Sequence, residues 1–406
     1  MTDTVVENKI CIIGNFEFPD GTAAGLRVLG NGRLFKKLGY EVIYIGLSRN
    51  CLPCKDNVPQ FRYLENFKCY NFEYPTGIKE WLFFHKKLHS VKNILSSERI
   101  SLVISYGSLS NSFFAIMLAY YCKKNHIAFV PDVVDWLAGG SGSRMFRIMK
   151  WVDTQIQKRV ANKLGRGMIM ISSCQKDYYR DGRPKLVLPP LSTYISDIDK
   201  QACINRNVTL VYAGYPFSVD SNVRDRSTFK DRLDVAIELL FLCRDLEFKF
   251  NVYGISITEY LLVIPSHRSI IEEMKDKVIF HGRCDRKEIR VATMDADYMF
   301  LYRDKNRMTD FGFPTKLVES LSYGTPVITT DTSDILKYIN DGCNGYILDR
   351  EDLEAGMIKL RGILSNKLPG LTMTKDEIIE NHPFADDYFS GDASVFLQYV
   401  LDNPSK

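Results

Sequence analysis

The sequence lacks a long apolar run: no stretch approaches the ~20 residues that a membrane-spanning helix requires. Its beginning, MTDTVVENK, is polar and acidic and has no signal-peptide architecture. The ten cysteines are scattered singly apart from Cys51 and Cys54, and CLPC has no second pair of metal ligands nearby. We therefore expect a cytoplasmic protein with reduced thiols, loop cysteines at 51 and 54, and no bound metal.

Excess charge and repetition are also scarce. The formal charge is +4 over 406 residues, which is too small to indicate a nucleic-acid partner, and no internal repeat or low-complexity segment is present. Hydrophobic residues make up 45% and charged residues 25%, as in globular proteins. Because the chain is too long for one ordinary core, two domains are expected.

What the sequence does contain is an alternation of β-rich runs with helical patterns. This alternation predicts an α/β fold with two parallel sheets and right-handed crossovers, that is, two Rossmann-like domains. We place the first domain at residues 1–192 and the second at 206–384, joined by a linker within 188–207. The aromatic-rich helical segment 385–406 is expected to return to the first domain. Two such domains facing each other would leave a central cleft for a ligand. The strand-like runs are KICIIG, EVIYIG, SLVISYG, AFVPDVVD, GMIMIS and LVLPP, then VTLVYAG, FKFNVYG, KVIFHG, ADYMFLYR, TPVITT and GYIL.

Residues 310–330, DFGFPTKLVESLSYGTPVITT, predict a loop, a short helix and a strand. Pro314 suits the first helical position and Gly324 suits the left-handed residue that ends a helix. A helix that starts at the carboxyl end of a parallel strand presents free N–H groups to a phosphate. The apolar face consists of Phe313, Leu317 and Leu321. The candidate phosphate-binding residues are Gly312, Phe313, Pro314, Thr315 and Lys316.

The succession of motifs over residues 277–350 resembles the GT-B glycosyltransferases of the retaining family 4. That family carries an E-x7-E motif, in which the second glutamate binds the nucleotide ribose and the first contacts the donor sugar. Glu319 matches the second glutamate, whereas Phe311 stands in the place of the first, with Asp310 beside it as an alternative carboxylate. Without a ligand role, Glu319 would be an exposed helix residue paired with Lys316.

The resemblance also implies basic residues that hold the donor diphosphate after a glycine. Gly214 matches the glycine and Lys230 the lysine, while the usual arginine is absent. Arg224 or Arg226 could supply that charge or could be ordinary loop residues. Cations are needed here because negative charge grows on the leaving diphosphate as the glycosidic bond breaks. Arg303, at a strand end, suits phosphate recognition, although a surface arginine remains an equal alternative.

In the first half, the loop at Gly21 and the helix after it resemble the family's glycine loop near the donor diphosphate and the acceptor. Asp132, Asp135 and Trp136 follow another strand. Asp135 is a candidate for orienting an acceptor hydroxyl, with Trp136 as an apolar wall. Both aspartates could instead cap a helix, which is the commoner use of aspartate there.

Two stretches, 79–95 and 144–166, combine basic and apolar residues. The second carries seven basic residues against one acid, Asp153. A basic amphipathic helix can lie on anionic lipid, or it can be an ordinary helix with a solvated face. The sequence leaves both interpretations of these stretches open: contact with the inner membrane surface, or an ordinary helix with a solvated face.

Together these features predict a retaining, hexosyltransferase-like glycosyltransferase. It would use a UDP- or GDP-sugar as co-substrate, with no tightly bound cofactor, and a glycan or lipid-linked acceptor hydroxyl. The setting would be the synthesis of a cell-surface polysaccharide or glycoconjugate. Two alternatives remain: a nucleotide-sugar epimerase on the same fold, and a degenerate subunit that binds nucleotide and stabilises another transferase.

Overall fold

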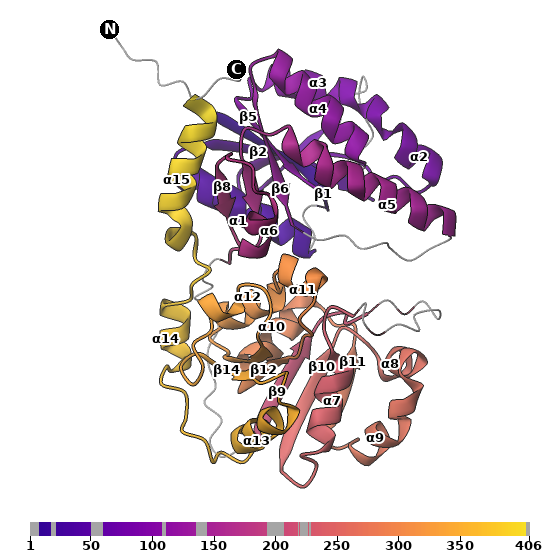
Figure 1. Cartoon of the computed structure of the whole chain (residues 1–406), viewed down its shortest axis with the longest axis vertical. Coiled ribbons are helices and arrows are strands. Elements are labelled where there is room, and N and C mark those ends of the chain that lie inside the picture. The colour runs from indigo at the N-terminus through magenta and orange to yellow at the C-terminus, as the bar shows by residue number, and fades with distance from the viewer. Residues whose placement is uncertain are drawn as a thin grey trace. The chain divides into compact units, whose positions relative to one another are not determined.

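The computed structural model describes residues 8–17, 22–49, 60–107, 111–134, 144–192, 207–217, 219, 226 and 229–402. Gly21, Cys51, Cys54, Asp135, Trp136, Arg224 and most of the expected linker lie outside these described residues. The chain divides into two compact units (Figure 1). Unit 1 comprises residues 1–191 and 386–406, and unit 2 comprises residues 192–385.

Unit 1 is built on an eight-stranded sheet in the order β3-β4-β2-β1-β5-β6-β7-β8. All neighbouring strands are parallel, except that β3 pairs antiparallel with β4. The strand-like runs identified in the sequence did not include β3 or β4. β1 and β2 are almost wholly buried, as expected for a parallel sheet covered on both faces. The strands are β1 (Lys9–Glu17), β2 (Glu41–Ser48), β3 (Phe61–Leu64), β4 (Phe67–Glu73), β5 (Leu102–Tyr106), β6 (Ala128–Val133), β7 (Met168–Met170) and β8 (Lys185–Val187).

The C-terminal helix α15 (Asp386–Asp402) belongs to unit 1, as the sequence predicted. It lies beside α1 (Ala23–Lys37), and Lys37 forms ion pairs with Asp386 and Asp387 (Figure 1). Its apolar side chains, among them Phe396 and Leu397, are buried. The other helices of unit 1 are α2 (Ile78–Leu82), α3 (Leu88–Ser97), α4 (Ser112–Lys124), α5 (Arg144–Arg159), α6 (Ser173–Tyr178), and the 3-10 helices η1 (Phe83–Lys87) and η2 (Ala161–Lys163).

Unit 2 is built on a six-stranded parallel sheet in the order β11-β10-β9-β12-β13-β14. From β9 the chain winds outward through β10 and β11, then crosses to the other side of β9 and continues through β12, β13 and β14. This reversal creates a topological switch point between β9 and β12, and ligands of such sheets bind at the carboxyl ends of the strands there. The strands are β9 (Val208–Ala213), β10 (Phe248–Tyr253), β11 (Val278–Gly282), β12 (Tyr298–Leu301), β13 (Val327–Thr330) and β14 (Gly345–Leu348).

The α-helices of unit 2 from α7 to α12 lie in the connections between successive strands, and α13 and α14 follow the last strand, β14. They are α7 (Leu233–Phe241), α8 (Ile257–Val263), α9 (Arg268–Glu273), α10 (Arg286–Asp295), α11 (Arg307–Phe311), α12 (Thr315–Ser322), α13 (Leu353–Leu364) and α14 (Lys375–Glu380). Short 3-10 helices are η4 (Pro265–His267) and η5 (Ile335–Lys337).

Candidate active site

Helix α12 carries the segment that the sequence singled out. Pro314 is its N-cap, with φ −77° and ψ 108°, so the helix starts one residue later than predicted because the ψ of Pro314 is extended. Gly324 has φ +76° and follows the end of the helix, as predicted. Leu317 and Leu321 are fully buried, and the ring of Phe313 packs against aromatic neighbours. The apolar face therefore fixes the helix and leaves Lys316 and Glu319 off that face.

Three neighbouring strands of unit 2 end at glycines with positive φ. These are Gly214 after β9 (+150°), Gly254 after β10 (+99°) and Gly282 at the end of β11 (+72°). A Cβ atom on Gly254 would lie 2.4 Å from the carbonyl oxygen of Gly214, and one on Gly214 would lie 1.9 Å from Cε of Lys316. Gly214 is therefore required for Lys316 to lie against the end of β9.

A buried carboxylate, Asp231, joins the groups at this edge of the sheet. Its side chain accepts hydrogen bonds from Nζ of Lys316 (2.5 Å) and the hydroxyl of Tyr212 (3.0 Å), and it pairs with Nε of Arg303 at 3.1 Å. Burial alone would raise the pKa of Asp231, but the charges of Lys316 and Arg303 and the hydrogen bonds lower it to about 2. One carboxylate therefore fixes two cations at the switch point.

Arg303 follows β12 and is only 4% exposed, which excludes the alternative of a surface arginine. Its main chain exchanges hydrogen bonds with the hydroxyl of Thr330 on the neighbouring strand β13. Its Nε also donates to the carbonyl oxygen of Lys230 (3.2 Å). The buried Nη1 has no hydrogen-bond partner among the described residues. Such a donor is costly to bury unless a ligand atom satisfies it.

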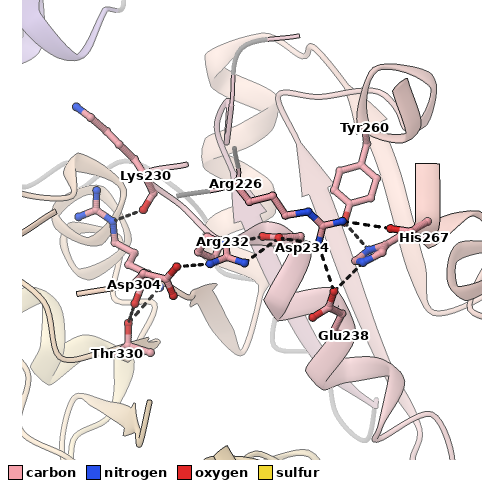
Figure 2. A network of polar contacts seen from close by, with 11 residues as sticks. Arg226, Lys230, Arg232, Asp234, Glu238, Tyr260, His267, Asp304 and Thr330 are labelled. Atoms are coloured by element: carbon pink, nitrogen blue, oxygen red, sulfur yellow. Dashed lines mark hydrogen bonds and ion pairs between the residues drawn. The ribbon is translucent and has the colours of Figure 1, made fainter. Parts of the chain in front are cut away.

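A network of ion pairs at the start of α7 reaches the loop after β12 (Figure 2). Arg232 pairs with Asp234 and with Asp304, the residue after Arg303. Arg226, which the sequence left as a candidate for the phosphate-binding arginine, lies 3.6 Å from Asp234 and 3.8 Å from Glu238. Its charge is thus directed at carboxylates of α7. The network ends at His267, which contacts Glu238 and Tyr260.

Lys230 was the lysine that the resemblance assigned to the diphosphate. Its side chain is exposed and in Figure 2 it extends away from the Arg232–Asp234 pair. Its carbonyl oxygen, rather than its ammonium group, contacts Arg303. The lysine that the fold holds against Gly214 is Lys316. A phosphate contact by Lys230 remains a prediction.

Glu319 lies one turn after Lys316 on α12. Its side chain is 36% exposed and lies 3.7 Å from Nη2 of Arg286. Burial raises the pKa of Glu319, and the nearby charges of Arg286 and Lys316 oppose that rise. Lys316 forms its hydrogen bond with Asp231, so the structure does not show the Lys316–Glu319 pair considered from the sequence. The Glu319 carboxylate accepts no hydrogen bond from the described residues, which leaves its oxygens available to hydroxyl groups.

Asp310, the alternative to the missing first glutamate, lies in α11 beside Phe311. Its Oδ1 accepts a hydrogen bond from the main-chain N–H of Ser333 (3.0 Å), and Ser333 has φ +54°. The carboxylate therefore stabilises the turn after β13. The nearby hydroxyl of Ser333 donates to the carbonyl oxygen of Gly312. A contact between Asp310 and the donor sugar stays a prediction.

In unit 1, Asp132 belongs to the strand-like run AFVPDVVD, and helix capping was its commoner expected use. It lies within β6 rather than at a helix cap, is 1% exposed and pairs with Arg27 of α1 at 2.8 Å. Arg27 also donates to the carbonyl oxygen of Leu188 (2.7 Å). Burial raises the pKa of Asp132, and Arg27 opposes the rise. Asp132 therefore has a structural role, because both partners are buried.

Asp231 and Tyr212 were not identified from the sequence. Tyr212 reads as one more apolar strand residue, and Asp231 lies next to Lys230, which drew attention as the basic residue. Only the long-range contact between β9, the start of α7 and α12 reveals them, since 85 positions separate Asp231 from Lys316. Among the described residues, no three His, Cys, Asp or Glu side chains gather in a way that could hold a metal ion.

The glycine at the end of β9 allows a direct test of the cluster. Replacing Gly214 with alanine should lower stability by about 1–3 kcal/mol through backbone strain, and should also displace Lys316 from Asp231. Nucleotide affinity should fall in the same variant. Gly342→Ala is the matched control, because Gly342 also has positive φ (+76°) but a Cβ there would meet nothing within 4 Å. Thermal unfolding and calorimetry should show a stability loss in both variants and weakened binding only in Gly214→Ala.

Comparison with known proteins matches part of unit 2 to a protein family. Residues 236–381 match the family described as glycosyl transferases group 1. The putative colanic acid biosynthesis glycosyltransferase WcaL of Salmonella typhimurium is 30% identical over 138 residues, which cover 32% of this chain. The alignment spans only 32% of the length of that relative.

Solved structures resemble the chain over nearly its full length. The lipopolysaccharide outer core galactosyltransferase WaaB, in its apo form, superposes with a TM-score of 0.64 at 14% identity and covers 96% of this chain and 99% of its own. Anabaena Alr3699/HepE in complex with UDP and glucose gives a TM-score of 0.59 at 13% identity, covering 96% and 99%. At these identities the likeness shows the fold. The chain therefore has the GT-B fold with two Rossmann-like units, and residues 236–381 of unit 2 match the glycosyl transferases group 1 family.

Proposed function

We propose that this protein is a retaining glycosyltransferase that moves a sugar from a UDP- or GDP-sugar to a hydroxyl group of a glycan or lipid-linked acceptor. The observation that carries the proposal is the cluster of Lys316, Asp231 and Arg303 beside Gly214 at the switch point of unit 2. Similarity to WcaL favours a role in polysaccharide biosynthesis.

The cluster suits a nucleoside diphosphate. The side chain of Lys316 is 20% exposed, so its ammonium group can contact a phosphate while it remains paired with Asp231. Arg303 adds a second, buried positive charge beside Asp231. As the glycosidic bond breaks, these fixed cations would stabilise the negative charge that develops on the leaving diphosphate. The first main-chain N–H groups of α12, those of Thr315 and Lys316, lie at the positive end of the helix dipole and would also favour that anion.

The sugar is then transferred on the face from which it left. In the mechanism we propose, the leaving phosphate oxygen accepts the proton of the incoming hydroxyl, and the chain supplies position and charge rather than a nucleophile. We propose that unit 1 binds the acceptor, with Gly21 and Asp135 as the candidate contacts. Lys230, exposed near Arg303, is proposed as a further contact to the donor.

Glu319 is proposed to bind the ribose, because one carboxylate can accept hydrogen bonds from two neighbouring hydroxyls. Glu319→Gln should weaken binding of the preferred nucleoside diphosphate by about 10- to 100-fold, since hydrogen bonds to charged groups contribute about 1.5–3 kcal/mol. Glu354→Gln, on the exposed first turn of α13, is the control and should bind normally. Titration calorimetry with UDP and GDP measures both. Equal affinity of Glu319→Gln and the wild type would remove the ribose assignment.

One further experiment separates transfer from the alternatives. The full chain is incubated with UDP- and GDP-sugars without an acceptor, and the products are followed by chromatography. Slow release of free sugar and nucleoside diphosphate supports a transferase, whose water reaction competes with the acceptor. An isomeric nucleotide sugar would indicate an epimerase. Binding with neither reaction, and no transfer to added glycans, would indicate a nucleotide-binding partner subunit.

A further inference from the structure

Helix α5 turns apolar side chains toward solvent. Met145, Ile148, Val152 and Ile156 follow a spacing of three or four residues, and Trp151 lies beside them. The exposed fractions are 75% for Met145, 65% for Ile148, 43% for Val152, 38% for Ile156 and 57% for Trp151. A surface helix of a globular protein normally turns its apolar stripe inward. The outward stripe on α5 therefore indicates a partner that accepts apolar side chains.

Basic residues share this exposed face. Arg144, Arg147 and Arg159 are all exposed, and each lies three or four residues from a member of the apolar stripe: Arg144 from Ile148, Arg147 from Trp151 and Arg159 from Ile156. The single acid of the helix, Asp153, is directed elsewhere. It accepts hydrogen bonds from the main-chain N–H and the hydroxyl of Ser112 at the start of α4 (2.8 and 2.6 Å). The face that α5 presents thus combines apolar and positively charged groups without a negative one.

Neighbouring elements extend the apolar surface. Lys150 of α5 lies over the ring of Trp81 in α2 (4.8 Å), so these helices are in contact, as Figure 1 also shows. The segment that contains Trp81 exposes Ile78, Leu82 and Phe83 at 51%, 45% and 53%. Phe113, at the start of α4, is 55% exposed and its ring meets that of His85 in η1.

We propose that this α5 face, formed by Met145, Ile148, Trp151, Val152 and Ile156 with Arg144, Arg147 and Arg159, binds the surface of a bilayer that contains anionic lipid. A helix of 16 residues lies in the interface plane over about 24 Å and inserts its apolar side chains about 5–10 Å deep. The arginines then meet the lipid phosphates. A second copy of the chain fits less well, because a symmetric contact would bring the arginines of both copies together.

The test uses the full chain and sedimentation with vesicles of phosphatidylcholine alone or with phosphatidylglycerol. The wild type should bind the anionic vesicles and bind neutral ones much less. Ile148→Asp with Val152→Asp should weaken binding at least about tenfold, since each buried aliphatic side chain contributes roughly that much. Arg144→Glu with Arg147→Glu should weaken vesicle binding by at least about tenfold, because each positive charge removed lowers the affinity about fivefold. The binding of this variant should also depend less on salt concentration.

Controls lie elsewhere on unit 1. Val395→Asp replaces an equally exposed residue (72%) on α15, and Lys123→Glu with Lys124→Glu reverses charges on exposed lysines of α4. Both should bind as the wild type does, and circular dichroism should show all variants folded. The proposal fails if the wild type ignores anionic vesicles or if the α5 variants bind unchanged. It also fails if sedimentation velocity shows a dimer that the Ile148→Asp change dissociates. Because no readout is enzymatic, these outcomes are independent of the sugar-transfer proposal.

Discussion

Replacement of Lys316 by methionine is expected to slow sugar transfer by about two to three orders of magnitude, the range seen when one preorganised charge-stabilising group is removed. Methionine keeps a long apolar side chain against Gly214 but removes the ammonium group. Asp231 would keep Arg303 and the Tyr212 hydroxyl as partners, so the fold should survive. Initial rates with the preferred nucleotide sugar, or of its hydrolysis, measure the effect.

A binding experiment identifies the phosphate as the group that Lys316 contacts. Affinity of the variant for the nucleoside diphosphate should fall, whereas affinity for the nucleoside without phosphates should stay unchanged. Lys275→Met, at an exposed lysine of unit 2 with 64% side-chain exposure, is the control and should match the wild type in both assays. Equal loss of nucleoside and diphosphate binding would show that Lys316 only supports the local structure.

The sequence was sufficient for the parts of the fold that depend on local pattern. Every strand-like run in the second half became a strand of unit 2, and the helix after Pro314 and the glycine at 324 were found within one residue. Apolar periodicity and glycine punctuation encode such features directly. β3 and β4 were missed, because β3 is a partly exposed edge strand of only four residues and Lys68 and Asn71 interrupt the apolar run of β4.

The parts that depend on contacts distant in sequence could not be predicted. Arg303 was expected equally as a surface residue or a ligand contact, yet it is buried because Asp231 pairs with it. Asp132 drew attention for its place after a strand run, yet Arg27, 105 positions away, makes it a structural ion pair. The sequence does not indicate which opposite charge will lie next to a given charged side chain in the folded protein.

Asp231 is the residue whose replacement should cost the most stability. Asp231→Asn removes the charge that Lys316 and Arg303 share, and it leaves Arg303 buried with an uncompensated charge. Removing one member of a buried ion pair costs about 3–5 kcal/mol. Urea unfolding measures the loss, with Asp245→Asn as the control. Asp245 pairs with Arg361 where both side chains are exposed, so its replacement should change stability little.

The same carboxylate makes stability depend on pH in a defined direction. The pKa of Asp231 is lowered from 3.8 to about 2 in the folded chain. A carboxylate with a lowered folded pKa stabilises the fold above its unfolded pKa, and that contribution disappears as pH falls through the folded value. The window is therefore about pH 4 down to pH 2, and a shift of about two units corresponds to about 2.5 kcal/mol. Wild-type unfolding free energy should fall across this window more steeply than that of Asp231→Asn. Parallel pH profiles for the two proteins would mean that Asp231 is not the anion that holds Lys316 and Arg303 together.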